Sequence, residues 1–407
     1  KDLADPKDMP IDDRHLSNKI LASDKVLHRG HAIAAVAASS AHMAEEIVSL
    51  IDVEYEVLPV VTNAEDAMKP GAPQLHKEYE RNITSRNESR LGDVENGFKK
   101  ADVIVEREFR TKTVHQGYIE PHSATASWAT GEGKITLWCS SQGHFQIGEN
   151  TAQVLGLSSS SIKVIPMEIG GGFGGKTTIY LEPVAAVLSK KTGKPVKITM
   201  SRSDVLEASG PTAGSYMKVK MGATNDGRLT AAQADLRFEA GAWAGSPVGA
   251  AAQTIFAPYD LENLLIDAYD VVDNKPKSTA YRAPGAPIGS FASESIVDEI
   301  CKKIAMDPLE FRILNGAKEG TRRSTGMINP VIGCIETAEA AKAHDHYNTV
   351  LAGPNRGRGV ASGFWMNGSG AACATANLNY DGTVNLTIGS VDIGGLRTGA
   401  AQQFAEV

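Results

Sequence analysis

The chain has 407 residues, of which 42% are hydrophobic and 22% are charged, and its formal net charge is −7. This length allows two or three globular domains, and the acidic balance argues against a nucleic-acid or anionic-membrane partner, because such a partner would call for a basic face. The four cysteines are widely spaced without a C-x-x-C pair, so we expect buried thiols rather than a zinc motif or disulfides, and a reducing, cytoplasmic location.

Residues 1–88 are predicted to form a small α+β domain that is incomplete on its N-terminal side. The apolar run at residues 32–38 (AIAAVAA) is typical of a buried strand, and residues 53–59 (VEYEVLP) form a second strand-like run. Between them, Ser39 or Ser40 is suited to cap a helix with one apolar face, made of Met43, Ile47, Val48 and Ile51. The pattern indicates a β-α-β unit, followed by a polar linker at residues 78–87.

Residues 89–348 are predicted to form a larger, mixed α+β lobe. Strand-like segments recur between turn signals: ADVIVEREFR, KITLWCS, SIKVIPMEI, PVKITMSR, SYMKVKMGAT and LTAAQADLRF. One helix is predicted from isoleucines that repeat every four residues: Ile296, Ile300 and Ile304. The next helix is predicted to start after Asp307, which is suited to be its N-cap.

Residues 349–407 are predicted to hold a linker, at residues 349–358, and the beginning of a further domain. New strand-like runs start at residues 359–364 and 383–388. The chain starts at Lys1 without a methionine and stops in residues that read as a helix, so we expect both ends to be cuts through a longer protein. The predicted fold class is α+β, with an incomplete domain at each end.

The segment EIGGGFGGKTT, at residues 168–178, lies between a strand-like run and a helical one. It contains G-x-x-x-x-G-K-S/T, the phosphate-binding loop of nucleotide hydrolases, and Asp267 ends the run LLID as an acid suited to magnesium. ATP hydrolysis is therefore one interpretation. However, Glu182 and Pro183 fall in the first helical turns, and the glycines exceed what a phosphate loop needs. The excess favours a backbone that approaches a bulky ligand, with a ligand-free turn as the alternative.

Three further clusters are candidates for a site. Arg282, in the rigid loop YRAPGAP, would suit a carboxylate, carbonyl or phosphate, although it could also cap a helix or pair with a surface acid. The segment HQGYIEPH, at residues 115–122, could bind a metal, but its spacing fits neither a helix face nor a strand face and favours a structural turn. The segment SSQGH, at residues 140–144, follows a strand end, where it could line a site or form a solvated turn.

Five motifs, taken in order and spacing, resemble the molybdenum hydroxylase family: HQGYIEPHSATA, SSQGH, GGGFGGK, YRAPGAP and DPLEFRILN. This family includes xanthine dehydrogenase, aldehyde oxidase, aerobic carbon-monoxide dehydrogenase and 4-hydroxybenzoyl-CoA reductase. The resemblance covers essentially the whole chain. It implies a partial molybdopterin-binding large subunit: a hammerhead-like domain, a first cofactor-binding lobe and the start of a second lobe.

The resemblance also implies a chemistry. In such enzymes molybdenum is held by the dithiolene of a pyranopterin, with no direct protein ligand to the metal, and a substrate carbon is hydroxylated with oxygen from water. The electrons pass to 2Fe–2S clusters and FAD, which we expect on partner subunits. We expect the cytosine dinucleotide form of the pterin.

Individual positions match the family's functional residues. The loop at residues 171–175 would lie against the metal's ligands, so side chains there would collide with the cofactor; its members are Gly171, Gly172, Phe173, Gly174 and Gly175. Gln142 matches a glutamine that hydrogen-bonds the apical oxygen. Arg282, followed by Ala283, matches an arginine that orients the substrate or stabilises negative charge. Gly394 and Gly395 match part of a pterin-binding loop.

Some positions depart from the family pattern. Thr177 stands where purine-oxidising relatives have a substrate-binding glutamate, which disfavours xanthine itself, and Ala283-Pro284 replaces the usual glycine and aromatic residue. Gly394-Gly395 lacks the glutamine of the usual G-Q-G loop. The catalytic glutamate is expected outside this chain, in the rest of the large subunit or in a second molybdopterin-subunit chain. Aroyl-CoA reduction, a catalytically decayed homologue and a phosphate-loop ATPase remain alternatives.

Overall fold

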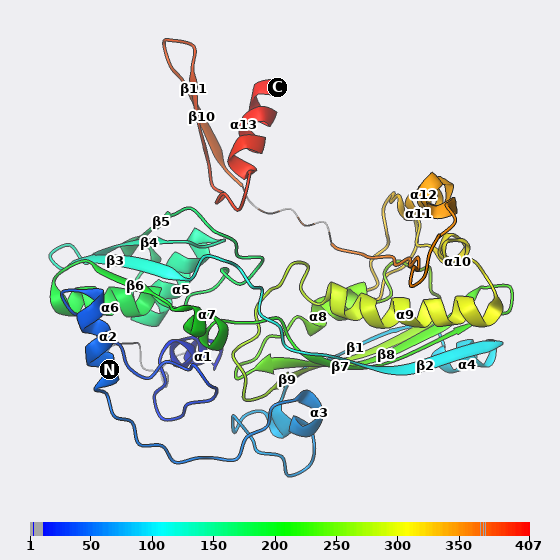
Figure 1. Cartoon of the computed structure of the whole chain (residues 1–407), viewed down its shortest axis with the longest axis horizontal. Coiled ribbons are helices and arrows are strands. Elements are labelled where there is room, and N and C mark those ends of the chain that lie inside the picture. The colour runs from blue at the N-terminus through cyan, green and yellow to red at the C-terminus, as the bar shows by residue number, and fades with distance from the viewer. Residues whose placement is uncertain (1–2, 4–10, 367, 369, 371) are drawn as a thin grey trace.

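The structure is a computed structural model, and it describes residues 3, 11–366, 368, 370 and 372–407 (Figure 1). Its described part contains a five-stranded sheet, a four-stranded sheet and a two-stranded hairpin, with helices packed on the two larger sheets. Strands run both parallel and antiparallel within each of the larger sheets. This mixed architecture confirms the predicted fold class.

The five-stranded sheet has the strand order β1 (Ile83–Leu91), β9 (Leu264–Val272), β8 (Leu229–Gly241), β7 (Ser215–Ala223) and β2 (Val103–Thr111). Strands β8 and β9 are parallel, and α8 (Val248–Thr254) lies in the connection between them. Alternate residues of β7 and β8 are buried, as expected for strands with one face in the core. Helix α9 (Ala286–Ile304) covers this face, and its Ile296 and Ile300 are fully buried there, as predicted.

The four-stranded sheet has the order β5 (Ile162–Pro166), β4 (Lys134–Cys139), β3 (Ser123–Ala129) and β6 (Val196–Thr199). Parallel strands β4 and β5 are connected through α5 (His144–Leu155) and the short 3₁₀ helix η3 (Ser159–Ser161). Helix α6 (Glu182–Thr192) packs on β3, and α7 (Arg202–Ala208) follows β6. Figure 1 shows the two larger sheets side by side, so the segments between them meet in the middle of the molecule.

The N-terminal region differs from the predicted β-α-β unit. Helix α2 (Ala41–Ser49) is present, and the Ser40 side chain caps it by accepting a hydrogen bond from the Met43 backbone N–H. Residues 32–38 and 53–59 form no strand, because a strand needs a neighbour for its backbone hydrogen bonds and no described strand lies beside them. Their apolar side chains remain largely exposed, and Val57 is 91% exposed. Helices α1 (Ile11–Ile20) and α3 (Ala64–Ala67) were not predicted.

The expected polar linker at residues 78–87 is also partly wrong. It contains the 3₁₀ turn η2 (Glu80–Asn82) and the start of β1. Because β1 is an edge strand, its charged side chains face solvent, and Arg86 forms a bidentate pair with Asp267 on β9 at 2.8 Å. A polar edge strand therefore has a composition similar to that of a linker, which explains the wrong prediction.

The remaining helices of this part of the chain are α4 (Val94–Lys99), which packs on β7 and β8, and α10 (Pro308–Asn315), α11 (Cys334–Ala343) and α12 (Asp345–Asn348), which follow α9 and pack on one another and on α9. Asp307 caps α10, as predicted, since its Oδ1 accepts hydrogen bonds from the Leu309 and Glu310 backbone N–H groups at 2.9 and 3.0 Å. Beyond α12, residues 359–364 form no strand. Instead, β10 (Ala374–Leu378) and β11 (Val384–Ile388) form an antiparallel hairpin before α13 (Leu396–Glu406).

Buried Arg312 attaches the segment after α12 to the main lobe. Its guanidinium donates to Glu294 at 2.8 Å and to the backbone carbonyl of Val360 at 2.9 Å. The Glu294 carboxylate in turn accepts from the backbone N–H of Ser362 at 2.6 Å. One buried ion pair therefore fixes the chain at the point where it leaves the lobe.

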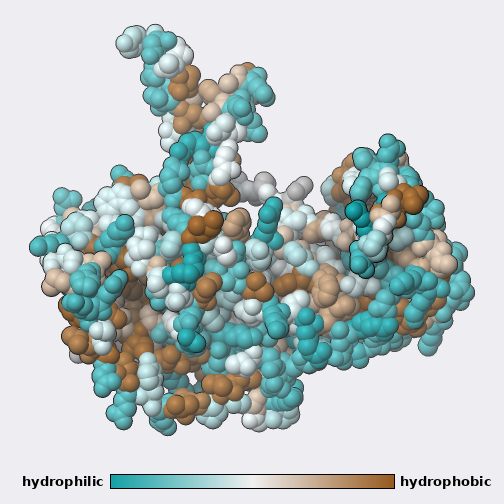
Figure 2. All heavy atoms as spheres, in the orientation of Figure 1, coloured by the Kyte–Doolittle hydropathy of each residue, from teal (hydrophilic) through white to brown (hydrophobic). Residues whose placement is uncertain are grey.

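The cysteines form no disulfide. Cys139 and Cys301 are buried and Cys334 is partly buried, but Cys373 is exposed, contrary to prediction, because it immediately precedes the projecting hairpin. None of the helices in the described ranges is long and apolar enough to cross a membrane. Figure 2 shows hydrophilic residues over most of the visible face, with hydrophobic patches toward its lower left.

Candidate functional site

The glycine loop at residues 170–175 packs closely against its own protein. A Cβ at Gly172 would lie 2.5 Å from Gln142 Oε1, and a Cβ at Gly174 would lie 2.5 Å from the carbonyl oxygen of Ala280. Gly171 and Gly174 also have φ angles of +95° and +105°, which other residues rarely adopt. The loop therefore needs glycine for its own packing, whether or not a cofactor lies on its other side. The predicted collision of side chains with a cofactor remains a prediction.

Gln142 lies between β4 and α5, directly behind the glycine loop. Its Oε1 accepts hydrogen bonds from the backbone N–H groups of Gly174, at 2.8 Å, and Lys176, at 3.1 Å. Two N–H donors require the carbonyl oxygen to face them, so the amide has one orientation and Nε2 points the other way. Among the described residues, Nε2 has no hydrogen-bond partner. Gln142 thus presents a fixed, unused N–H donor next to the loop.

Arg282 lies beside the same loop. Its backbone N–H donates to the Phe173 carbonyl at 2.8 Å, and both Arg282 and Ala283 have positive φ angles, of 21° and 61°. Strained residues of this kind persist where the surroundings hold them in place, often at ligand sites. The Arg282 side chain is exposed and makes no ion pair with any described residue. It lines a cavity of about 440 Å³ with apolar side chains of Val114, Ile288 and Phe291.

Gln116 holds the segment that leads into the Arg282 loop and packs against the glycine loop at Gly175; it was not singled out from the sequence. Its Nε2 donates to the carbonyl oxygens of Gly210 and Ala280 at 3.0 and 2.8 Å, whereas its buried Oε1 has no partner. That oxygen faces Gly175, where a Cβ would lie 2.9 Å away. Its place in HQGYIEPH was the only available signal.

The segment at residues 115–122 is a structural turn, as the spacing favoured. The His122 ring is buried and lies 2.7 Å from the Tyr118 hydroxyl, and His115 lies 2.8 Å from Ser209 Oγ. Burial, followed by the nearby charge of Lys176, lowers the pKa of His122 to about 3, so this histidine is neutral. Glu120 accepts hydrogen bonds from Lys176 Nζ and the Gly170 N–H at 2.5 and 2.6 Å. The polar side chains of this segment therefore already have hydrogen-bond partners, and they form no metal-binding cluster among the described residues.

The nucleotide interpretation does not fit this geometry. The Lys176 side chain is fully buried against Glu120, so it cannot reach a phosphate, and Thr177 Oγ1 donates to the Gly174 carbonyl at 3.0 Å. Helix α6 begins only at Glu182, so its N-terminus does not follow the loop directly. Asp267 lies within β9 and is paired with Arg86. The phosphate-loop match is therefore a coincidence of sequence.

Gly394 and Gly395 precede α13, with φ angles of +116° and +92°. Asp392 Oδ1 accepts hydrogen bonds from the N–H groups of Gly394 and Leu396 at 3.0 and 3.1 Å. Arg397, in the first turn of α13, contacts Glu168 at 3.1 Å. This exposed contact brings the start of α13 to the segment that leads into the glycine loop.

Two family profiles match the chain. The profile described as the molybdopterin cofactor-binding domain matches residues 75–316, and the aldehyde oxidase and xanthine dehydrogenase a/b hammerhead domain matches residues 1–59. The nicotinate dehydrogenase large molybdopterin subunit of Eubacterium barkeri is 35% identical over 79% of this chain and 76% of that subunit. The xanthine dehydrogenase molybdenum-binding subunit of Escherichia coli is 29% identical over 97% of this chain and 54% of that subunit.

Solved structures agree. The aldehyde oxidoreductase from Desulfovibrio desulfuricans has a TM-score of 0.83 and 26% identity over 90% of this chain, and the CO dehydrogenase from Oligotropha carboxidovorans has a TM-score of 0.71 and 26% identity over 81%. The chain spans 42% and 44% of those two chains. The predicted resemblance is confirmed: the chain belongs to the aldehyde oxidase and xanthine dehydrogenase family of molybdenum hydroxylases, and residues 75–316 are its molybdopterin cofactor-binding domain.

Proposed function

We propose that this chain is the cofactor-binding part of a molybdenum enzyme that hydroxylates an aldehyde or an N-heteroaromatic carbon. The oxygen derives from water, and the electrons pass to 2Fe–2S clusters and FAD on partner subunits. We keep the domain boundaries expected from the sequence as part of this proposal: a hammerhead-like domain at residues 1–88, a first cofactor lobe at 89–348, and a linker with the start of a second lobe at 349–407.

The orientation of Gln142 carries this proposal. Its Oε1 is held by the Gly174 and Lys176 N–H groups, so the unused Nε2 donor is fixed in place before any ligand arrives. A preoriented donor is what an oxygen ligand of a bound cofactor requires. Gln116 Oε1, buried and without a partner, is a second polar atom that fits a polar group near the loop. The residues present therefore fit a molybdopterin cofactor.

The bound cofactor would supply the redox chemistry at the substrate carbon. The chain's own residues would hold the pterin along Gly171, Gly172, Phe173, Gly174 and Gly175, next to Arg282 and Ala283, with Gly394 and Gly395 approaching from the start of the second lobe. We propose the cytosine dinucleotide form. The catalytic glutamate would come from the remaining half of the large subunit or from a second molybdopterin-subunit chain.

The cavity beside Arg282 supports the substrate class. Its wall is apolar apart from Arg282 and a few polar groups, so it suits a flat ring or an aldehyde carbon chain. The exposed guanidinium would bind a carboxylate or a carbonyl oxygen and stabilise negative charge that develops there. The 35% identical relative is named a nicotinate dehydrogenase, which favours the N-heteroaromatic class. The free cysteines support a reducing, cytoplasmic location.

The test is metal analysis and dye-linked turnover of the chain with its natural partners, supplied with aldehydes and N-heteroaromatic acids. We expect one molybdenum per complex and a loss of about 10²–10³-fold in turnover for Arg282→Ala and for Gln142→Ala. Matched controls are Arg29→Ala and Gln146→Ala, both at exposed positions, which should keep full activity. Turnover only in the reducing direction with an aroyl-CoA would indicate the reductase alternative. A complex without molybdenum or activity would indicate a decayed homologue.

A further inference from the structure

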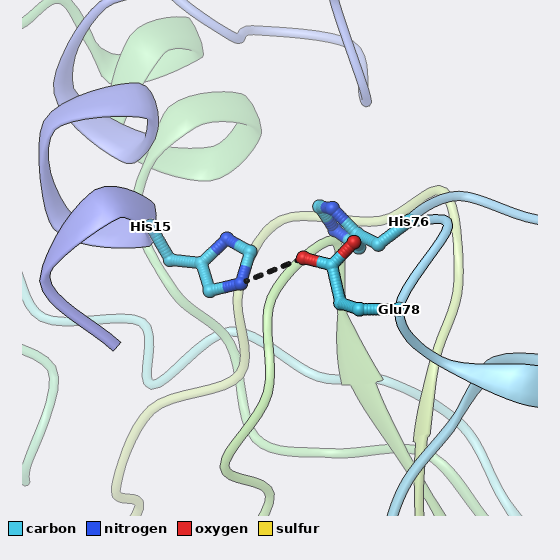
Figure 3. A group of neighbouring side chains, drawn as sticks. All are labelled: His15, His76 and Glu78. Carbon is cyan, nitrogen blue, oxygen red and sulfur yellow. Dashed lines mark ion pairs between the residues drawn. The ribbon is translucent and has the colours of Figure 1, made fainter. Parts of the chain in front are cut away.

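Two histidines and a glutamate from separate parts of the chain meet in a cluster that contains none of the residues of the proposed site (Figure 3). His15 lies on α1, whereas His76 and Glu78 lie in the segment between α3 and β1. Figure 3 shows the His15 ring and the Glu78 carboxylate pointing toward each other, with the His76 ring beside them. None of these residues has a role in the proposed function.

The candidate ligand atoms lie near one another, and His15 Nε2 also lies 3.1 Å from the Tyr79 hydroxyl. His15 Nε2 and Glu78 Oε1 are 3.6 Å apart, and one nitrogen or oxygen from each residue lies within 4.8 Å of the others. In a tetrahedral zinc site, bond lengths of about 2.0–2.2 Å place neighbouring ligand atoms roughly 3.3–3.5 Å apart. Side-chain rotations that move these atoms by about 1 Å would therefore complete the geometry.

The surroundings already orient one ligand. His76 Nε2 lies 2.6 Å from the Ala242 carbonyl oxygen. A carbonyl oxygen can only accept, so Nε2 carries the hydrogen and Nδ1 keeps the lone pair that a metal needs. A histidine that donates to a backbone carbonyl through its other nitrogen is the usual outer-sphere arrangement of metal-binding histidines.

The backbone that carries His76 and Glu78 is also held firmly. Asn82 is fully buried, and its Oδ1 accepts from the Leu75 N–H at 3.0 Å while its Nδ2 donates to the Pro73 carbonyl at 2.9 Å. Gln74 Nε2 donates to the Tyr79 carbonyl at 2.8 Å. The ligands on this segment are therefore preorganised, and His15 on α1 completes the set.

We propose that His15, His76 and Glu78 form a zinc site that ties α1 to the segment between α3 and β1. Two imidazoles and one carboxylate suit Zn²⁺, whereas Mg²⁺ and Ca²⁺ prefer oxygen ligands throughout. The His15 side chain is 13% exposed and that of Glu78 is 42% exposed, so solvent reaches the cluster and water takes the fourth position. The metal would join two segments that are distant in the sequence.

The test is equilibrium binding of Zn²⁺ to the purified chain with its partners, after removal of loosely bound metal with a chelator. We expect one Zn²⁺ per chain at this site and an affinity at least about 100-fold lower in His15→Ala and in Glu78→Gln. The matched control is the double variant H42A/E46Q, because His42 and Glu46 form a similar contact at 3.3 Å on the exposed surface of α2. It should bind Zn²⁺ like the parent protein, and Mg²⁺ should not compete.

Replacement of Zn²⁺ by Co²⁺ gives a second, spectroscopic test of the site. Co²⁺ in the site should give the intense visible absorption of tetrahedral coordination, and Glu78→Gln should lose it while circular dichroism shows the fold intact. Molybdenum content and turnover should stay unchanged in Glu78→Gln, which separates this proposal from the proposed function. Absence of Zn²⁺ binding, or equal affinity in the parent, His15→Ala and Glu78→Gln, would overturn the zinc site.

Discussion

The buried pair of Lys176 and Glu120 should be the most sensitive ionic contact behind the glycine loop. The Lys176 side chain is 0% exposed and that of Glu120 is 31% exposed, with 2.5 Å between Nζ and Oε2. The same carboxylate holds the Gly170 N–H. Glu120→Ala would leave the lysine charge buried without its partner, which typically costs 3–5 kcal/mol. Because Glu120 is partly exposed, water reaches the vacated site, and we expect a loss of about 3 kcal/mol in the free energy of unfolding.

Thermal unfolding followed by circular dichroism measures this effect. For a lobe of this size, about 3 kcal/mol corresponds to a decrease of roughly 6–12 °C in the unfolding midpoint. Lys176→Met removes the buried charge itself and should cost only about 1 kcal/mol. The control is Glu106→Ala, which breaks the exposed pair of Glu106 and Lys218, 2.7 Å apart, and should cost less than about 1 kcal/mol.

The pH dependence gives a second check on the same pair. Burial lowers the pKa of Lys176 below its usual 10.5 in the folded protein, and loss of Glu120 should lower this pKa further. The folded variant then binds fewer protons than the unfolded chain, so its stability rises as the pH approaches 10.5. The difference from the parent should therefore narrow in alkali. The reasoning is refuted if Lys176→Met is the more damaging change, or if Glu106→Ala costs as much as Glu120→Ala.

Three other outcomes are expected. At Gly174 the φ angle is +105°, and an added Cβ would lie 2.5 Å from the Ala280 carbonyl oxygen. Gly174→Ala should therefore lower the free energy of unfolding by about 2–4 kcal/mol and remove most of the bound molybdenum. The control Gly131→Ala, which has open space around its Cβ, should be nearly neutral. Because the pKa of His122 is about 3 in the folded protein, only the unfolded chain binds a proton at this residue between pH 7 and pH 5. Acidification over this range should therefore lower the free energy of unfolding of the parent protein by about 2 kcal/mol through His122. Denaturant unfolding of His122→Gln should show a correspondingly smaller decrease. Arg312→Ala leaves Glu294 buried without its cation, so it should cost about 3–5 kcal/mol and make residues 349–365 susceptible to limited proteolysis; an unchanged cleavage pattern would contradict the anchoring role.

The elements that could be predicted are those in which the spacing of apolar residues matches the buried face of a strand or helix. Strands β2, β7 and β8 alternate apolar and polar residues, and helix α9 repeats isoleucine every four residues, so their patterns were sufficient. Strand β1 was missed because its edge position leaves its side chains in solvent. Residues 32–38 and 53–59 were assigned to strands on apolarity alone, which says nothing of a pairing neighbour.

The candidate site was likewise predicted only in part from the sequence. The sequence singled out Gln142, Arg282 and the glycine loop, and the structure brings all of them together through backbone hydrogen bonds. Gly394 and Gly395 lie close to the contact of Arg397 with Glu168, which joins this segment to the same region. The cluster of His15, His76 and Glu78 depends on how α1 docks on the lobe, and no local pattern encodes that docking.

The tight packing behind the glycine loop distinguishes residues that the fold requires from residues that only the reaction requires. Because Gln142, Ala280 and Tyr118 occupy the space that side chains at Gly172, Gly174 and Gly175 would need, a descendant that had abandoned molybdenum would still have to keep these glycines in order to fold. The motif therefore records ancestry, whereas the exposed Arg282 guanidinium, which forms no ion pair with any described residue, is free to change once catalysis stops. In a survey of relatives, the residue at the position of Arg282 would separate active enzymes from inactive ones better than the glycines that identify the family.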